Sequence, residues 1–154
     1  VAVGGNSYGG SSGGFAIPRH ADLVTAAIPM CGMYRLEIDY HATEMPHGRA
    51  YSEEMMGGTP DEFPEKYANA SPGRFITSIR GHVMIVHGLA DSNVGPENTH
   101  AAIRDLTAAG IPHEVLLFPD EGHGVFRRRN VETYLRQSAE FLDRAFRAGM
   151  RPAG

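Results

Sequence analysis

The sequence predicts an α/β fold built on a parallel sheet. Short apolar runs of strand type lie at residues 23–31, 82–87 and 113–118, and segments of helical character follow them. This alternation of strand and helix is typical of crossover helices on a parallel sheet. A chain of 154 residues is one domain at most.

The first element is a strand of small residues, VAVGG at positions 1–5, which runs into a turn and a Gly-rich helix. Residues 9–14, GGSSGG, would be typical of a flexible linker if they stood alone. Proline lacks a backbone N–H and its ring collides with the preceding helical turn. We therefore expect Pro18 to end or kink this helix near Ile17.

Residues 33–75 interrupt the alternation with Pro, Gly, acidic and aromatic residues. Only one short helix is expected in this excursion, near residues 50–56. An excursion of this length usually forms a binding surface, so we expect it to contribute to a substrate pocket.

Two further helices are predicted after the excursion. The first covers residues 96–110, with Pro96 near its first position and Gly110 as its stop, and its apolar face comprises Ala102, Ile103, Leu106 and Ala109. Asn130 is expected to cap the last helix, which ends at Gly149. The expected apolar face of that helix comprises Val131, Tyr134, Leu135, Phe141, Leu142 and Phe146.

Composition excludes several classes of function. Lys and Arg total 14 against 18 for Asp and Glu, which argues against nucleic acid as the main partner. No apolar run approaches the ~18–20 residues of a membrane span. The single cysteine, Cys31, allows no internal disulfide and is compatible with a reducing compartment such as the cytoplasm. No Cys/His spacing typical of a metal site occurs, so we expect neither a metal nor another cofactor.

Ser7 lies in a G-x-S-x-G pattern where the first strand meets the helix. In such a turn the serine is strained and exposed, and a β-carbon at Gly5 or Gly9 is expected to collide with a neighbouring element. The Tyr8 backbone N–H, at the helix N-terminus, is then placed to stabilise an oxyanion. The alternatives are a Gly/Ser linker and a phosphate loop, but the phosphate loop needs a lysine where Ser11 stands.

Two more candidates follow apolar strands. Asp91 comes four residues after the strand at 82–87, and His123 follows the strand at 113–118 between Gly122 and Gly124. Taken separately, Asp91 is typical of an Asx turn and His123 of a solvated loop. Together, Ser7, Asp91 and His123 stand at three strand ends in the chain order of the α/β-hydrolase triad.

These motifs give the chain a family resemblance. Through GGNSYGG, VHGLADSNV, the strand HEVLLFPD and the loop EGHG, it resembles the C-terminal part of the prolyl oligopeptidase family of serine peptidases, also called peptidase family S9. The resemblance implies a partial α/β-hydrolase domain over residues 1–154. It makes Ser7 the nucleophile, His123 the general base and then acid, Asp91 the group that orients His123, and the Tyr8 N–H an oxyanion donor.

The resemblance also implies substrates and missing parts. Asn93 matches an asparagine that helps to hold the substrate backbone, although a turn former fits equally well. Tyr51 resembles one aromatic wall of a proline-sized pocket, while Met55 replaces the second and puts proline specificity in doubt. Short peptides are the expected substrates. The first half of the sheet, a second oxyanion donor and a propeller domain are expected upstream of Val1, which is not a starting methionine.

Other assignments remain open at this point. An esterase or acyl-amino-acid hydrolase would use the same triad, and an inactive fragment or scaffold would share the sequence motifs. Cys31 is expected to be a buried core thiol. His82 and His87 flank an apolar strand and are expected to be packed or hydrogen-bonded rather than catalytic.

Overall fold

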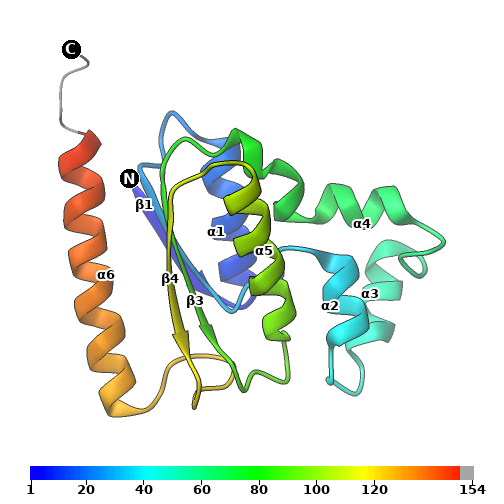
Figure 1. Ribbon diagram of the computed structural model, residues 1–154. Coiled ribbons are helices and arrows are strands. Elements are labelled where there is room, and N and C mark those ends of the chain that lie inside the picture. Colours follow the sequence, from blue (N-terminus) through cyan, green and yellow to red (C-terminus); the bar gives the residue numbers. More distant parts are fainter. Residues whose placement is uncertain (150–154) are drawn as a thin grey trace.

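The computed structural model describes residues 1–149, and these form a sheet with helices on both faces (Figure 1). Within the described residues the sheet has four strands, all parallel, in the order in which they occur along the chain. The strands are β1 (Ala2–Asn6), β2 (Ala26–Met30), β3 (His82–Gly88) and β4 (His113–Phe118). The predicted α/β class is confirmed, with each strand boundary within about three residues of the prediction.

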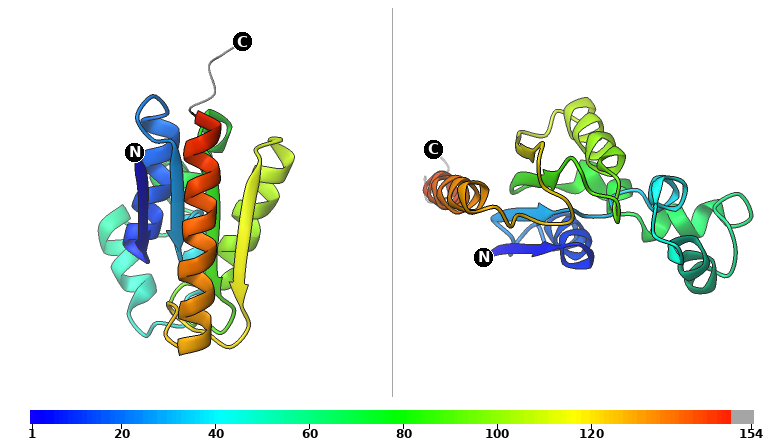
Figure 2. Two further views of the ribbon diagram at one scale, coloured as in Figure 1. Left: turned by 90° about the vertical axis from the view of Figure 1, so that its left-hand side faces the viewer. Right: turned by 90° about the horizontal axis from the view of Figure 1, so that it is seen from below.

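The helices divide between the two faces of the sheet. Figure 2 shows α6 alone on one face, with α1 and α5 on the other and α2 to α4 beyond them. The helical bounds are α1 (Tyr8–Arg19), α2 (Leu36–Ala42), α3 (Gly48–Met56), α4 (Pro64–Ala70), the 3₁₀ helix η1 (Pro72–Ser78), α5 (Pro96–Ala108) and α6 (Arg128–Gly149). Within residues 1–149, no helix combines the length and the apolar character needed to cross a membrane.

The core lies in two layers because successive side chains of a strand point to opposite faces. In β3, Val83 and Ile85 pack on the side of α1 and α5, whereas Met84 and Val86 pack on the side of α6. All five residues of β2 are buried. The central strands therefore anchor the fold, and the loops at their carboxyl ends are fixed on a rigid base.

Helix α1 runs to Arg19, two residues beyond the predicted end at Ile17. Pro18 is the penultimate residue of the helix. It therefore removes one late hydrogen bond without interrupting the turns that support Ser7. The GGSSGG segment lies inside this helix, so the linker reading is wrong.

The excursion contains more helix than predicted. Residues 33–75, all of them described, hold α2, α3, α4 and the start of η1 rather than a single helix. The helix expected near residues 50–56 corresponds to α3. Helices α2 and α4 have seven residues each, which is too short to show an apolar period. Tyr67 of α4 is 1% exposed and anchors this unit.

Helix α6 departs from the prediction at its start and along its apolar face. It begins at Arg128, so Asn130 lies inside it, where the Asn130 amide donates to the carboxylates of Asp120 (3.0 Å) and Glu121 (2.8 Å). Phe141 is 3% exposed, but Leu135 and Phe146 are 59% and 39% exposed. Only part of the predicted apolar face of α6 packs against the sheet. Gly149, the predicted stop, is the last residue of α6.

Two glycines allow the turn after β1 to pack closely. A β-carbon at Gly5 would lie 2.7 Å from the carbonyl carbon of Gly9, and one at Gly10 would collide with the backbone of Met30 and Gly32. A β-carbon at Gly9 would meet nothing within 4 Å. The expected collision is therefore confirmed at Gly5 and wrong at Gly9, where the required residue is the neighbouring Gly10.

This packing predicts opposite effects for two adjacent substitutions. Gly10→Ala in the intact protein should lower the free energy of unfolding by about 1–3 kcal/mol, because an overpacked contact against backbone cannot relax. Gly9→Ala is the matched control and should be neutral or stabilise by up to ~1 kcal/mol, since alanine is the better helix former. Chemical denaturation of both variants tests this, and an equal loss in both would contradict it.

Candidate active site

Ser7 stands at the junction of β1 and α1 in a strained backbone conformation. Its φ angle is 58°, in the left-handed region that few residues other than glycine adopt. Its backbone N–H donates to the carbonyl of Met30 at 3.0 Å, which fixes the turn to the end of β2. Tyr8 is the first residue of α1, so its N–H has no partner within the helix and can stabilise a negative charge beside Ser7.

Asp91 lies in the loop after β3, and its side chain is fully buried. Its Oδ1 accepts hydrogen bonds from the backbone N–H groups of Asn93 (2.9 Å) and Val94 (3.0 Å). Its Oδ2 is 2.8 Å from His123 Nδ1 and 3.2 Å from His87 Nε2. Asp91 therefore forms the Asx turn that was one of its predicted roles, and it also contacts His123.

These contacts set the charge of Asp91. Burial alone would raise its pKa, but hydrogen bonds from His87, His123 and the two backbone amides outweigh burial and lower the pKa to about 2. Asp91 is thus a carboxylate throughout the neutral range. A buried carboxylate of this kind stabilises an imidazolium next to it.

His123 lies in the loop after β4, with its side chain 22% exposed. Because Asp91 accepts the Nδ1 proton, the neutral ring presents Nε2 as an acceptor. The backbone carbonyl of His123 accepts a hydrogen bond of 3.3 Å from the Asn6 amide, one residue before Ser7. The loop that carries His123 is therefore tied to the turn that carries Ser7.

Ser7 and His123 line the same pocket, which has a volume of ≈ 600 Å³. No hydrogen bond joins the Ser7 and His123 side chains in the part of the chain that the structure describes. Catalytic contacts of this type are commonly long in the free protein and shorten when substrate binds. The pocket wall comes mainly from the excursion and is largely apolar, and it includes Met33, Leu36, Met45, Tyr51, Met55 and Met56.

The two less specific candidates also lie at this pocket. Tyr51 and Met55, from α3, both line it and are 62% and 64% exposed. Asn93 lines it as well, while its backbone N–H belongs to the Asx turn of Asp91. The structure thus brings the candidates named from the sequence to one pocket, except for Asp91, which does not line the pocket but contacts His123.

Sequence reasoning missed Asp39, which lines the pocket from α2. Its Oδ1 is buried and has no hydrogen-bond partner. Burial first, and then the negative charge of Asp91, raise the pKa of Asp39 to about 6, while His123 opposes the shift. Asp39 was missed because α2 itself was not predicted.

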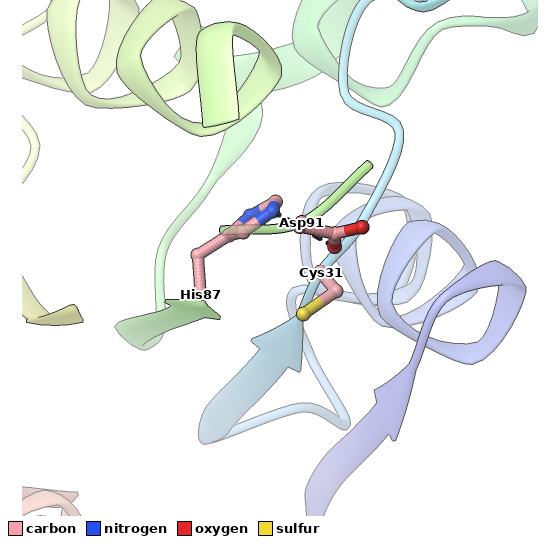
Figure 3. Close-up of side chains that lie close together, drawn as sticks. All are labelled: Cys31, His87 and Asp91. Atoms are coloured by element: carbon pink, nitrogen blue, oxygen red, sulfur yellow. Dashed lines mark ion pairs between the residues drawn. The ribbon is translucent and has the colours of Figure 1, made fainter. Parts of the chain in front are cut away.

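Cys31, His87 and Asp91 lie together below the pocket, with one potential metal-ligand atom of each within 4.8 Å of the others (Figure 3). Cys31 is fully buried, as predicted. Burial raises the pKa of its thiol to about 12, so the thiol keeps its proton. Because His87 Nε2 faces two acceptors, it also keeps its proton, and this donor set does not suit a metal ion.

Comparison with known proteins finds similarity to one family of peptidases. The model of the prolyl oligopeptidase family matches residues 1–149. The chain is 30% identical over 144 residues to dipeptidyl-peptidase 5 of Porphyromonas endodontalis. The aligned region covers 91% of this chain and 20% of that protein. The chain is 26% identical over 148 residues to a prolyl endopeptidase of Mus musculus, covering 95% and 18% respectively.

Solved structures show the same similarity. A puromycin-hydrolyzing peptidase of Mycobacterium tuberculosis matches with a TM-score of 0.85 and 28% identity over 99% of this chain and 22% of that one. An acylaminoacyl peptidase of Pyrococcus horikoshii matches with a TM-score of 0.83 and 22% identity, over 94% and 24%. The chain therefore has part of an α/β-hydrolase fold, and it spans about a fifth of the length of these relatives.

The raised pKa of Asp39 predicts a pH-dependent change in stability. The folded state holds the Asp39 proton up to about pH 6, whereas the unfolded chain releases it near 3.8. The stability gained from this proton is complete below pH 3.8 and is lost as the pH rises through 6. Asp39→Asn should therefore raise the melting temperature of the intact protein at pH 8 and leave it nearly unchanged at pH 4.

Thermal denaturation at the two pH values tests this, with Asp61→Asn as the control. Asp61 is an exposed carboxylate of the same excursion. An increase in melting temperature for Asp39→Asn that is equal at pH 4 and pH 8 would show that Asp39 ionises normally.

Proposed function

The chain belongs to the prolyl oligopeptidase family, and on that premise we propose that the protein is a serine peptidase with Ser7 as its nucleophile. The observation that carries the proposal is the 2.8 Å hydrogen bond between a fully buried Asp91 and His123, beside a pocket that Ser7 also lines. This arrangement matches the roles in a serine hydrolase triad.

The proposed reaction proceeds through an acyl-enzyme. Ser7 Oγ attacks the carbonyl carbon of the scissile bond while His123 Nε2 takes the hydroxyl proton. Asp91 stabilises the resulting imidazolium, and the Tyr8 N–H donates to the oxyanion. His123 then gives its proton to the leaving amine as the C–N bond breaks. Water, activated by the same imidazole, hydrolyses the acyl-enzyme and restores Ser7.

The positions of the supporting groups favour this assignment over a structural serine. The φ of 58° holds Ser7 out of both the strand and the helix, which stores backbone strain at that residue. Strain of this kind persists where the surrounding structure enforces it, and Gly5, Gly10 and the Met30 carbonyl provide that enforcement. We propose that a second oxyanion donor comes from the part of the protein outside this chain.

Short peptides are the proposed substrates, with residues 33–75 as one wall of the substrate pocket. The methionines and Tyr51 in that wall suit an apolar side chain next to the scissile bond. Asn93, at the same pocket, is proposed to hold the substrate backbone. The similar proteins are named as dipeptidyl, prolyl and acylaminoacyl peptidases, and this supports amide rather than ester hydrolysis.

Replacing the nucleophile should abolish turnover. Ser7→Ala in the intact protein should lower kcat by about 10³- to 10⁶-fold, because the covalent step is lost while binding is retained. Ser12→Ala is the matched control, since Ser12 lines the same pocket and donates only to the Tyr8 carbonyl at 2.9 Å. Steady-state kinetics with peptide amides, together with circular dichroism, measure the effect. An unchanged rate in Ser7→Ala would remove this residue from the mechanism.

Labelling distinguishes the enzyme from an inactive scaffold. A fluorophosphonate should modify Ser7 of the intact protein in a way that mass spectrometry locates, whereas a scaffold would remain unlabelled. Parallel assays of matched amide and ester substrates then separate a peptidase from an esterase. Cleavage of esters alone would contradict the peptidase assignment and leave the triad in place.

The pocket wall predicts a change in KM. Tyr51→Ala should raise KM about 10-fold for substrates with a large apolar residue before the scissile bond, because a contact worth about 1–2 kcal/mol is lost. Leu135→Ala is the control, since Leu135 is similarly exposed, does not line the pocket and belongs to α6, which lies on the face of the sheet opposite α1 and α5 (Figure 2). Kinetics across a series of apolar residues tests this. A KM equal to that of the wild-type protein would place the substrate elsewhere.

A further inference from the structure

His87 is a second histidine in contact with Asp91, and the proposed mechanism does not use it. It is the penultimate residue of β3 and is fully buried. Its Nε2 lies 3.2 Å from Asp91 Oδ2 and 3.0 Å from the Val94 carbonyl, and its Nδ1 lies 2.6 Å from Thr99 Oγ1. Figure 3 shows its ring directed toward Asp91.

These contacts determine where the His87 proton lies. A carboxylate and a carbonyl are both acceptors, so Nε2 between them carries the hydrogen, which it donates to the Val94 carbonyl while lying 3.2 Å from Asp91 Oδ2. Nδ1 then accepts a hydrogen bond from the Thr99 hydroxyl. Thr99 and Val94 thus hold His87 as a donor aimed at Asp91.

His87 is also one of the polar groups that surround the Asp91 carboxylate. Asp91 Oδ1 accepts from two backbone amides, and Oδ2 accepts from His123 and lies 3.2 Å from Nε2 of His87. A carboxylate has about four acceptor sites, so both oxygens are held on both sides. The two backbone amides cannot be removed by substituting a side chain, whereas the imidazole of His87 can. His87 is therefore the contact that mutagenesis can test.

We propose that His87 is a positioning residue that fixes Asp91, and through it the ring of His123, for reaction with Ser7. This inference rests on the proposed serine peptidase function. A merely structural role would make His87 a link between β3, the loop at 89–95 and α5. Loss of such a link would lower stability without a selective effect on the chemical step.

The test uses the intact protein and compares His87→Leu with His87→Gln, because the glutamine amide can place a donor where Nε2 lies. His87→Leu should lower kcat by about 10- to 100-fold, as expected when one hydrogen bond to a charged group is lost, with KM changed less than about threefold. His87→Gln should recover most of that loss. His82→Gln, at the exposed start of the same strand, is the control and should match the wild-type protein.

The pH profile gives a readout that a structural role would not move. The ionisable groups around Asp91 are His87 on β3, His123 after β4, Cys31 after β2 and Asp39 on α2. With one donor removed, Asp91 stays buried and its pKa rises above the value near 2. The activity ratio of His87→Leu to the wild-type protein should therefore be constant near neutral pH and fall as the pH is lowered toward the raised pKa of Asp91, whereas a structural defect would give the same ratio at every pH.

Thr99→Val keeps the test decisive if His87→Leu does not fold. This change replaces the hydroxyl that holds the His87 ring with a methyl group, and it should lower kcat several-fold with an unchanged KM. An unchanged kcat in Thr99→Val and His87→Leu, or a loss in His87→Leu that glutamine does not recover, would overturn the inference. Labelling of Ser7 in the wild-type protein tests the proposed function independently. If Ser7 is labelled but the His87 variants behave like the wild-type protein, only the positioning role of His87 is wrong.

Discussion

The site depends on one buried carboxylate, which hydrogen bonds and polar contacts stabilise in its ionised form. Asp91 lies below the pocket, with backbone amides on one oxygen and two imidazoles on the other. A buried charge without such partners would cost several kcal/mol and would take up a proton instead. Because it stays ionised, Asp91 holds His123 in one tautomer and orientation. The parallel sheet makes this possible, since the carboxyl ends of β1, β3 and β4 meet at one edge.

The second requirement is a backbone that holds Ser7 beside His123. The left-handed conformation of Ser7, the hydrogen bond to the Met30 carbonyl and the close approach allowed by Gly5 and Gly10 fix the turn from below. The side-chain amide of Asn6 donates to the backbone carbonyl of His123 and so links this turn to the loop after β4. Ser7 is thereby held by contacts of its own turn, whereas Asp91 and His123 are joined directly through their side chains.

Much of this arrangement could be predicted from the sequence. Strands β2 and β3 were recognisable because buried parallel strands are continuous apolar runs, and Ser7, Asp91 and His123 were recognisable because each lies in the turn or loop that follows a strand. Helices α2 and α4 are too short to show a period, which hid Asp39. Asn130 has the character of a cap but bonds instead to Asp120 and Glu121, from a loop nine to ten positions away. The role of His87 depends on contacts with Asp91, Val94 and Thr99 that only the fold specifies.

The central claim concerns the convergence of Ser7, His123 and Asp91, and the most direct measurement is an experimental structure of the intact protein with a phosphonate bound covalently. The account predicts a bond to Ser7 Oγ, with a phosphonyl oxygen within hydrogen-bond distance of the Tyr8 N–H. It also predicts His123 Nε2 within about 3 Å of the adduct while Nδ1 remains bonded to Asp91. An adduct on another residue, or a His123 ring turned away from the adduct with its Asp91 contact broken, would contradict it.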